Sequence, residues 1–229
     1  RDRLRSRGLG DVYKRQFKAK RIALVNGVGL DLNKFIEATQ EEKQKVRREF
    51  RLKDEDIFAI SVAQLIKRKN HMVLIQAAAK LHNPHFHLFI CGDGVQEAEL
   101  KKKAKELGVE HQIHFLGFRK DVYKISSAAD LFLFASLQEG LPVAIMEAMA
   151  CGLPIVASRI RGNIDLIDSG KGGYLVHPMN VDGFVKGIQK ITENKERLER
   201  MKRYNLEKVQ KYGIDAVVEQ MAGLYQSMM

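Results

Sequence analysis

Two glutamates, Glu139 and Glu147, stand eight positions apart, one just before a predicted apolar helix and one within it. The helix is predicted to place Pro142 in its first turn, where a missing N–H costs nothing, and to end at Gly152. Its residues are apolar on nearly every side, which is typical of a buried helix. Because a buried carboxylate without a partner is costly, Glu147 needs a cation or the hydroxyl groups of a ligand beside it.

The start of this helix offers a second kind of chemistry. The free N–H groups of its first turn, near Gly140 and Leu141, form an anion site with the helix dipole behind them. One short segment therefore combines a carboxylate, a phosphate cradle and a second carboxylate about two helical turns further on. A diphosphate flanked by two hydroxyl-rich groups has this layout, and a nucleotide-sugar is such a ligand.

The segment from Glu139 to Glu147 resembles the paired-glutamate signature of retaining glycosyltransferases of family 4, which have the two-domain GT-B fold. The flanks Glu-Gly-Leu-Pro and Glu-Ala-Met-Ala-Cys-Gly-Leu-Pro-Ile-Val-Ala-Ser strengthen the resemblance, which extends over residues 18–229 and is closest to capsular and exopolysaccharide enzymes. It implies that Glu139 is catalytic and contacts the donor sugar, that Glu147 contacts the ribose, and that Gly140, Leu141 and Pro142 bind the diphosphate. The alternative is a core helix in which Glu147 either extends its carboxylate to solvent or has a structural ion-pair partner.

A cluster of cations, Lys67, Arg68 and Lys69, precedes another predicted helix, and such a cluster favours phosphate. The resemblance places an arginine at the position of Gln64 and a lysine at Lys69, both as diphosphate ligands. Gln64 keeps a hydrogen-bond donor but lacks the charge, for which Lys67 or Arg68 could compensate. The alternative is a solvated basic loop.

Two glycine-containing loops are further candidates. The resemblance implies that the loop at Gly117 and Phe118 contacts the base through backbone groups. The ring of Phe118 either stacks on the base or packs in the core. The run Gly92-Asp93-Gly94 allows close approach of the backbone to a ligand, but it also fits a plain tight turn.

The histidines and cysteines do not predict a metal site. No metal-ligand spacing is present, and we interpret the histidines as surface or strand residues and the two cysteines as small core residues. These residues are His82, His85, His87, His111, His114, His177, Cys91 and Cys151. No metal and no cofactor is expected, because backbone donors and the helix dipole can hold a diphosphate.

Short apolar strands alternate with helices along the chain, which indicates a parallel sheet covered on both faces. Strands are predicted at 57–63, 86–91, 112–116, 131–135, 154–157 and 173–176, and helices at 70–81, 95–107, 120–128, 142–151 and 163–167. The fold class is therefore α/β, a doubly wound Rossmann-like sheet forming one half of a GT-B fold, with C-terminal helices. Ligands of such a sheet bind beyond the carboxyl ends of the strands.

Four segments are expected. Residues 1–16 form a non-native or disordered basic tail, unless they are a native basic arm, and 17–38 form a hinge from a missing N-terminal domain, with a short strand at 21–25. Residues 39–212 form the nucleotide-sugar-binding domain, whose first helix begins with a capping box of Thr39 and Glu42. Residues 213–229 form a helix with an apolar stripe that is expected to pack on the missing domain and to be partly exposed without it.

The net charge of +11 is unevenly distributed. Residues 1–21 hold nine basic and two acidic residues, so they account for +7 and leave +4 for the rest of the chain. This distribution, without aromatic residues interleaved with arginine, argues against a nucleic-acid partner. A mild positive charge suits an anionic donor or peripheral association with an anionic membrane. Without a signal peptide or an apolar span of membrane length, a cytoplasmic location is expected, at the inner face of the membrane if the chain associates with it.

The expected reaction is transfer of a sugar from a nucleotide-sugar, UDP-linked in this interpretation, to a saccharide or lipid-linked acceptor, with retention of the anomeric configuration. The acceptor would bind through the missing domain, so this chain alone is expected to bind the donor without transferring it. One rival is a sugar-nucleotide epimerase of GT-B type, which product analysis would distinguish. The other is a non-catalytic basic module, whose binding would weaken steeply with salt and depend on residues 1–21.

Overall fold

The structure is a computed structural model, and it describes residues 25–26 and 29–227. The predicted tail at 1–16 and nearly all of the predicted strand at 21–25 lie outside the described residues. So does Met228, the last residue of the predicted apolar stripe.

Six parallel strands form one sheet in the order β3-β2-β1-β4-β5-β6. The strands are β1 (Ile57–Val62), β2 (Phe86–Cys91), β3 (Ile113–Gly117), β4 (Leu131–Phe134), β5 (Ile155–Ser158) and β6 (Gly173–Val176). Every predicted strand from residue 57 onward is present within one residue of its predicted ends. The sequence therefore predicted the doubly wound α/β sheet correctly.

Helices follow most of the strands and cover the sheet. They are α2 (Gln40–Glu49), α3 (His71–Leu81), α4 (Glu97–Glu106), α5 (Val122–Ala128), α6 (Val143–Ala150), α7 (Asn163–Leu166), α8 (Val181–Thr192), α9 (Lys195–Val209) and α10 (Ile214–Gln226). The predicted helices are confirmed, although α4 and α5 each begin two residues later than expected. The capping box of α2 is also confirmed, because the Thr39 side chain accepts from the Glu42 amide and Glu42 accepts from the Thr39 amide.

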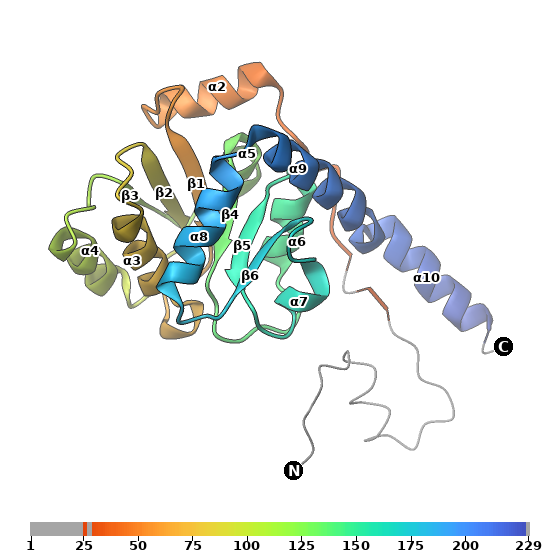
Figure 1. The fold of residues 1–229 in the computed structure, drawn as a ribbon. Helices are drawn as coiled ribbons and strands as arrows, with labels where there is room; N and C mark the ends of the chain where they lie inside the picture. Colours follow the sequence, from red (N-terminus) through yellow and green to blue (C-terminus); the bar gives the residue numbers. More distant parts are fainter. Residues whose placement is uncertain (1–24, 27–28, 228–229) are drawn as a thin grey trace, which may run out of the picture.

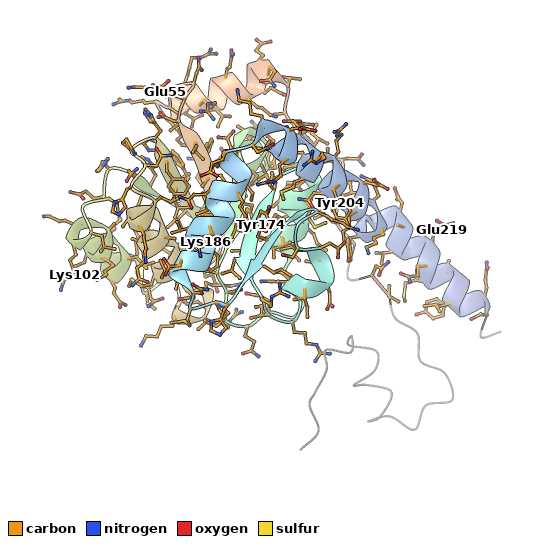
Figure 2. All side chains as sticks on the ribbon, in the orientation of Figure 1. Glu55, Lys102, Tyr174, Lys186, Tyr204 and Glu219 are labelled. Carbon is orange, nitrogen blue, oxygen red and sulfur yellow. The ribbon has the colours of Figure 1, made fainter. Side chains whose placement is uncertain are left out.

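The core lies in two layers, one on each face of the sheet. Phe58 and Ile60 of β1 point into one layer with α5 and α6, while Ala59 between them points into the other with α3, α4 and α8. Figure 1 shows α8 in front of the sheet and α3 next to it, with α4 further toward the β3 edge. The outer surfaces of the helices are polar, and Figure 2 shows Lys102 on α4 and Lys186 on α8 pointing outward.

Leu30, in the segment predicted to be a hinge, is joined to the start of α10. Leu30 pairs with Gly213 in a parallel bridge, since its amide donates to the carbonyl of Tyr212 at 2.8 Å and its carbonyl accepts from Ile214 at 3.0 Å. From there α10 extends away from the sheet (Figure 1). Its apolar stripe is partly exposed as predicted, because Val217 is buried while Val218 is 60% exposed.

The described helices do not include a candidate membrane span. None of those within residues 25–26 and 29–227 is both long enough and apolar enough to cross a bilayer.

Candidate functional site

The strand order reverses between β1 and β4, which are neighbours at the middle of the sheet (Figure 1). In doubly wound sheets the loops after two such strands diverge and leave a crevice in which ligands bind. Here the two loops are joined by hydrogen bonds. The Leu137 amide donates to the carbonyl of Arg68 at 2.8 Å, and Nη1 of Arg68 donates to the carbonyl of Gln138 at 2.8 Å. Two of the predicted site segments therefore meet at this point.

Glu139 lies where these two loops meet, and it is held through one oxygen. Its Oε1 atom accepts from Nζ of Lys69 at 2.7 Å, from Nη1 of Arg68 at 3.1 Å and from Oγ of Ser136. Within the part of the chain that the structure describes, Oε2 has no partner. Glu139 thus has one anchored oxygen and one that can accept a hydrogen bond from a ligand.

The protonation state of Glu139 follows from these contacts. Burial alone would raise the pKa of its carboxyl group, but the hydrogen bonds from Lys69 and Ser136 and the charges of Lys69 and Arg68 outweigh burial and lower the pKa below its usual value. Glu139 is therefore ionised at neutral pH.

A chain of buried hydrogen bonds supports Glu139 from behind. Ser136 donates to Glu139, the hydroxyl of Ser158 donates to the carbonyl of Ser136, and Nδ2 of Asn163 donates to the carbonyl of Ser158 at 2.8 Å. All three supporting side chains are buried. These three residues were not identified from the sequence, because single serine and asparagine residues after strands are common and point to no particular chemistry.

The start of α6 differs by one residue from the prediction. Pro142 is not in the first helical turn but precedes it as the N-cap, with an extended backbone (φ −75°, ψ 111°), and the helix begins at Val143. Among the described residues, no acceptor is found for the amides of Gly140, Leu141, Val143 and Ala144. The free N–H groups predicted near Gly140 and Leu141 are therefore found, with two more at Val143 and Ala144, whereas Pro142 has no N–H group.

Gly162, in the neighbouring loop, packs against the backbone of the segment before α6. Its φ of +86° is strained for other residues, and a Cβ atom there would lie 2.1 Å from the carbonyl oxygen of Gly140. Only glycine allows the loop after β5 to press against the loop after β4. This residue was not identified from the sequence.

Glu147 faces a cavity of about 640 Å³ on the β1–β3 side of the crevice. Gln64 and Phe118 line the same cavity, so three predicted site residues meet there, whereas Gly117 and Lys69 are not part of its lining. Lys34 from the hinge also lines it and was not identified from the sequence.

The Glu147 carboxylate is unpaired in the described structure. Burial raises its pKa, and the charge of Lys34 lowers it only in part. No ion pair or side-chain hydrogen bond reaches Glu147 from any described residue, so the structural ion-pair partner considered above is not found. A partly buried carboxylate without a partner is suited to ligand hydroxyl groups.

The two glycine-containing loops have different roles. Phe118 is 71% exposed and therefore does not pack in the core, which leaves it free to stack on a ligand. Gly92 and Gly94 instead support the loop of Gln64, since a Cβ atom at Gly92 would lie 2.0 Å from the carbonyl oxygen of Ala63. The tight-turn interpretation of this run is therefore sufficient.

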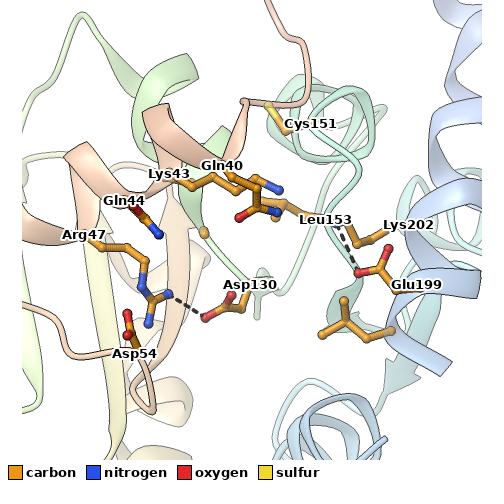
Figure 3. A pocket seen from close by; sticks show the side chains of 13 residues that line it. Gln40, Lys43, Gln44, Arg47, Asp54, Asp130, Cys151, Leu153, Glu199 and Lys202 are labelled. Atoms are coloured by element: carbon orange, nitrogen blue, oxygen red, sulfur yellow. Dashed lines mark hydrogen bonds and ion pairs between the residues drawn. The ribbon is translucent and has the colours of Figure 1, made fainter. Parts of the chain in front are cut away.

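A second, smaller cavity of about 280 Å³ lies at the amino ends of the strands (Figure 3). Four of its six charged side chains pair within it, Arg47 with Asp130 and Lys202 with Glu199, and Lys43 pairs with Glu37 outside the lining. These pairs leave little charge for a ligand, and we do not assign it a function.

The remaining candidate ligands for a metal are not clustered. No group of three or more His, Cys, Asp or Glu side chains that could hold a metal is present among the described residues. His87 and His114 contact each other on β2 and β3, at 3.1 Å between Nδ1 and Nε2, in agreement with their interpretation as strand residues. Cys91 and Cys151 are free and buried, as expected.

A family model described as "Glycosyl transferases group 1" matches residues 42–208, most of the chain. The chain belongs to this family. The family match agrees with the resemblance that the paired glutamates indicated, and glycosyltransferase is the activity named for its relatives.

Two curated relatives illustrate the similarity of this group 1 glycosyltransferase chain. It is 31% identical over 73% of its length to an Escherichia coli UDP-Gal:alpha-D-GlcNAc-diphosphoundecaprenol alpha-1,3-galactosyltransferase. It is 34% identical over 66% of its length to a Campylobacter jejuni N-acetylgalactosamine-N,N'-diacetylbacillosaminyl-diphospho-undecaprenol 4-alpha-N-acetylgalactosaminyltransferase. The matches span 44% and 41% of these relatives, so the chain covers less than half of each.

Solved structures with the same fold are also GT-B glycosyltransferases. Anabaena HepE in complex with UDP superposes with a TM-score of 0.81 at 25% identity, over 87% of this chain and 56% of HepE. The C-terminal domain of LpcC, a group 1 protein from Francisella tularensis, has a TM-score of 0.73 at 22% identity, over 81% of this chain and the whole of that structure. The Rossmann-like sheet therefore corresponds to one half of the GT-B fold.

Proposed function

We propose that this chain binds the donor in a retaining glycosyltransferase, which transfers a sugar from a UDP-linked donor to a saccharide or lipid-linked acceptor in the synthesis of cell-surface polysaccharide. The observation that carries the proposal is the arrangement of Glu139 and Lys69 at the start of α6, beside the cavity that holds Glu147. The order of these groups matches a nucleotide-sugar: Glu139 for the sugar, Lys69 and the free amides of α6 for the diphosphate, and Glu147 for the ribose.

In this proposal the nucleoside occupies the cavity of about 640 Å³. Glu147 accepts hydrogen bonds from the ribose hydroxyls, and the exposed ring of Phe118, next to Gly117, stacks on the base. Gln64 lines the cavity toward the loop of Lys69, where the diphosphate begins.

The diphosphate lies at the start of α6. The free amides of Gly140, Leu141, Val143 and Ala144 donate to its oxygens, Pro142 shapes the turn, and Lys69 adds a positive charge. When the bond from the anomeric carbon to the diphosphate breaks, negative charge develops on the leaving group, and these donors stabilise it. Glu139 holds the donor sugar through its free oxygen.

The comparisons support the choice of donor and acceptor class. UDP is named in the structure of HepE, and UDP-Gal is named for the Escherichia coli relative. Both curated relatives are named for acceptors linked to diphosphoundecaprenol, which agrees with a lipid-linked acceptor. A cytoplasmic site at the inner face of the membrane is part of the proposal, since the described body of the chain is mildly basic.

Calorimetry with UDP-, GDP- and ADP-sugars tests this function directly. We expect the chain to bind UDP-sugars, and to bind UDP more tightly than uridine because the diphosphate meets Lys69 and the helix amides. The absence of binding to every nucleotide-sugar in the panel would overturn the proposal.

A further inference from the structure

The carboxyl edge of the sheet has an excess of positive charge. The loops after β1, β4, β5 and β6, at residues 63–70, 135–142, 158–163 and 177–180, contain five basic residues and one acidic residue, a net charge of +4 with histidine neutral. The basic residues are Lys67, Arg68, Lys69, Arg159 and Arg161, and the acid is Glu139. Neighbouring loops with one sign of charge attract anions.

These cations differ in how far they are already engaged. Arg68 and Lys69 contact Glu139, whereas Lys67, Arg159 and Arg161 are exposed and have no ion-pair partner in the described part of the chain. In the proposed function, Lys69 and the amides at the start of α6 bind the donor diphosphate. The two arginines after β5 are not used by the proposed function.

Their backbone is held beside the loop of Glu139 by contacts with neighbouring loops. Gly162 presses against the carbonyl of Gly140, so Arg161 lies directly beside the loop of Glu139, and the amide of Arg159 donates to the carbonyl of Val176 at 2.5 Å. Asn70 also ties this side together, because its Nδ2 atom donates to the carbonyl of Pro178 at 2.9 Å. The arginines therefore lie on the β5–β6 side of Glu139, whereas the nucleoside cavity is on the β1–β3 side.

We propose that Arg159 and Arg161 form a second anion subsite, which binds a carboxylate or phosphate group of the substrate beyond the transferred sugar. This inference rests on the proposed function, because it uses the order nucleoside, diphosphate and sugar along the crevice. The guanidinium group matches both anions with paired hydrogen bonds. Two sources supply such a group: the carboxylate of an acidic donor sugar, or a phosphate on the acceptor.

The first arm of the test compares UDP-glucuronate with UDP-glucose, which differ in the group at C6. If the anion belongs to the donor sugar, the wild-type chain binds UDP-glucuronate roughly tenfold more tightly or better, the effect of a charge-assisted hydrogen bond. The double variant Arg159→Gln/Arg161→Gln then loses this preference and keeps its affinity for UDP, which also shows that it is folded.

The second arm adds inorganic diphosphate to the chain saturated with UDP. If the anion belongs to the acceptor, diphosphate binds the wild-type complex and binds the double variant roughly tenfold less tightly. The matched control is Arg48→Gln/Arg203→Gln, which removes the same charge from exposed arginines on α2 and α9 that have no ion pair with any residue the structure describes. We expect this control to behave like the wild type in both arms.

The outcomes separate the two proposals. If the wild-type chain binds UDP but neither arm depends on the arginine pair, or if the control variant has the same loss, the subsite is overturned and the donor function stands. If the wild-type chain does not bind UDP, the donor function is overturned and the subsite with it.

Discussion

Nζ of Lys69 lies 2.7 Å from Oε1 of Glu139, so the cation expected at the diphosphate and the carboxylate expected at the donor sugar form an ion pair. Both side chains are mostly shielded from solvent, with 14% and 11% of their surfaces exposed. The pair keeps each partner in place and prevents a lone buried charge. Because only one carboxylate oxygen is used, the pair can persist when a ligand hydroxyl binds the other.

Lys69→Ala should weaken binding of UDP far more than binding of uridine. The variant removes a charge-assisted hydrogen bond to the diphosphate, worth roughly 1.5–3 kcal/mol, which corresponds to about a 10- to 150-fold loss of affinity. Calorimetry with the two ligands measures the difference. An equal loss for UDP and uridine would show that Lys69 is not at the phosphates.

Gln64→Arg should strengthen UDP binding, because it restores a charge at the edge of the cavity where the family resemblance expects one. The residue is exposed, so the larger side chain fits without repacking the core. A matched control is Gln96→Arg, which adds the same charge just before α4. If Gln64→Arg leaves the UDP affinity unchanged, the assignment of this loop to the diphosphate is wrong.

Ser136→Ala should reduce the advantage that UDP-glucose has over UDP, with little change for UDP itself. The variant removes the hydrogen bond that fixes the Glu139 carboxylate, and NMR titration should show a higher pKa for Glu139. The loss of stability is expected to be about 0.5–1.5 kcal/mol.

Ser127→Ala is the control for this experiment. It removes a comparable hydrogen bond, from Oγ to the carbonyl of Lys124 at 2.9 Å, outside the crevice. It should lose similar stability without changing ligand preference. If Ser136→Ala weakens UDP and UDP-glucose equally, Ser136 has only a structural role.

Most of the fold could be predicted from the sequence, because buried parallel strands leave continuous apolar runs such as 57–62 and 131–134. The errors are at helix starts, where local geometry decides. At α6 the extended conformation of Pro142 moves the first helical residue to Val143. Proline favours both positions, so the sequence does not distinguish them.

The site was predicted only where residue types are distinctive. Glu139, Glu147 and Lys69 stand out because charges beside apolar segments need an explanation. Ser158 and Gly162 act through contacts with the loop after β4, since the hydroxyl of Ser158 donates to the carbonyl of Ser136 and Gly162 closely approaches the carbonyl of Gly140. Such contacts depend on the order of the strands in the sheet and have no local signal.

Stability should fall as the pH drops from about 6.5 toward 4, because His114 resists protonation in the folded state. Burial, with the charges of His87 and His111, lowers the pKa of His114 from 6.5 to about 4. The unfolded chain takes up the proton first, so stability is complete above pH 6.5 and decreases below it, by about 1.4 kcal/mol for each unit of difference in pKa.

Urea unfolding at a series of pH values between 7.5 and 4.5 measures this dependence. His114→Phe should reduce the slope, since phenylalanine keeps the stacking on Phe89 but does not titrate. An unchanged slope in the variant would exclude His114 as a source of the effect.

Glu147 and Glu139 are proposed to contact different parts of the donor, the ribose and the sugar. Glu147→Gln replaces a carboxylate that can accept from two ribose hydroxyls with an amide that has one acceptor oxygen, so UDP affinity should fall with or without a sugar. Glu139→Gln should leave UDP binding almost intact and reduce only the advantage of UDP-glucose over UDP.

Calorimetry of UDP and UDP-glucose with both variants is therefore the most direct test. We expect a crossed pattern, in which Glu147→Gln weakens binding of both ligands and Glu139→Gln weakens binding of UDP-glucose alone. Equal losses of UDP affinity in the two variants, or unchanged binding in both, would contradict it.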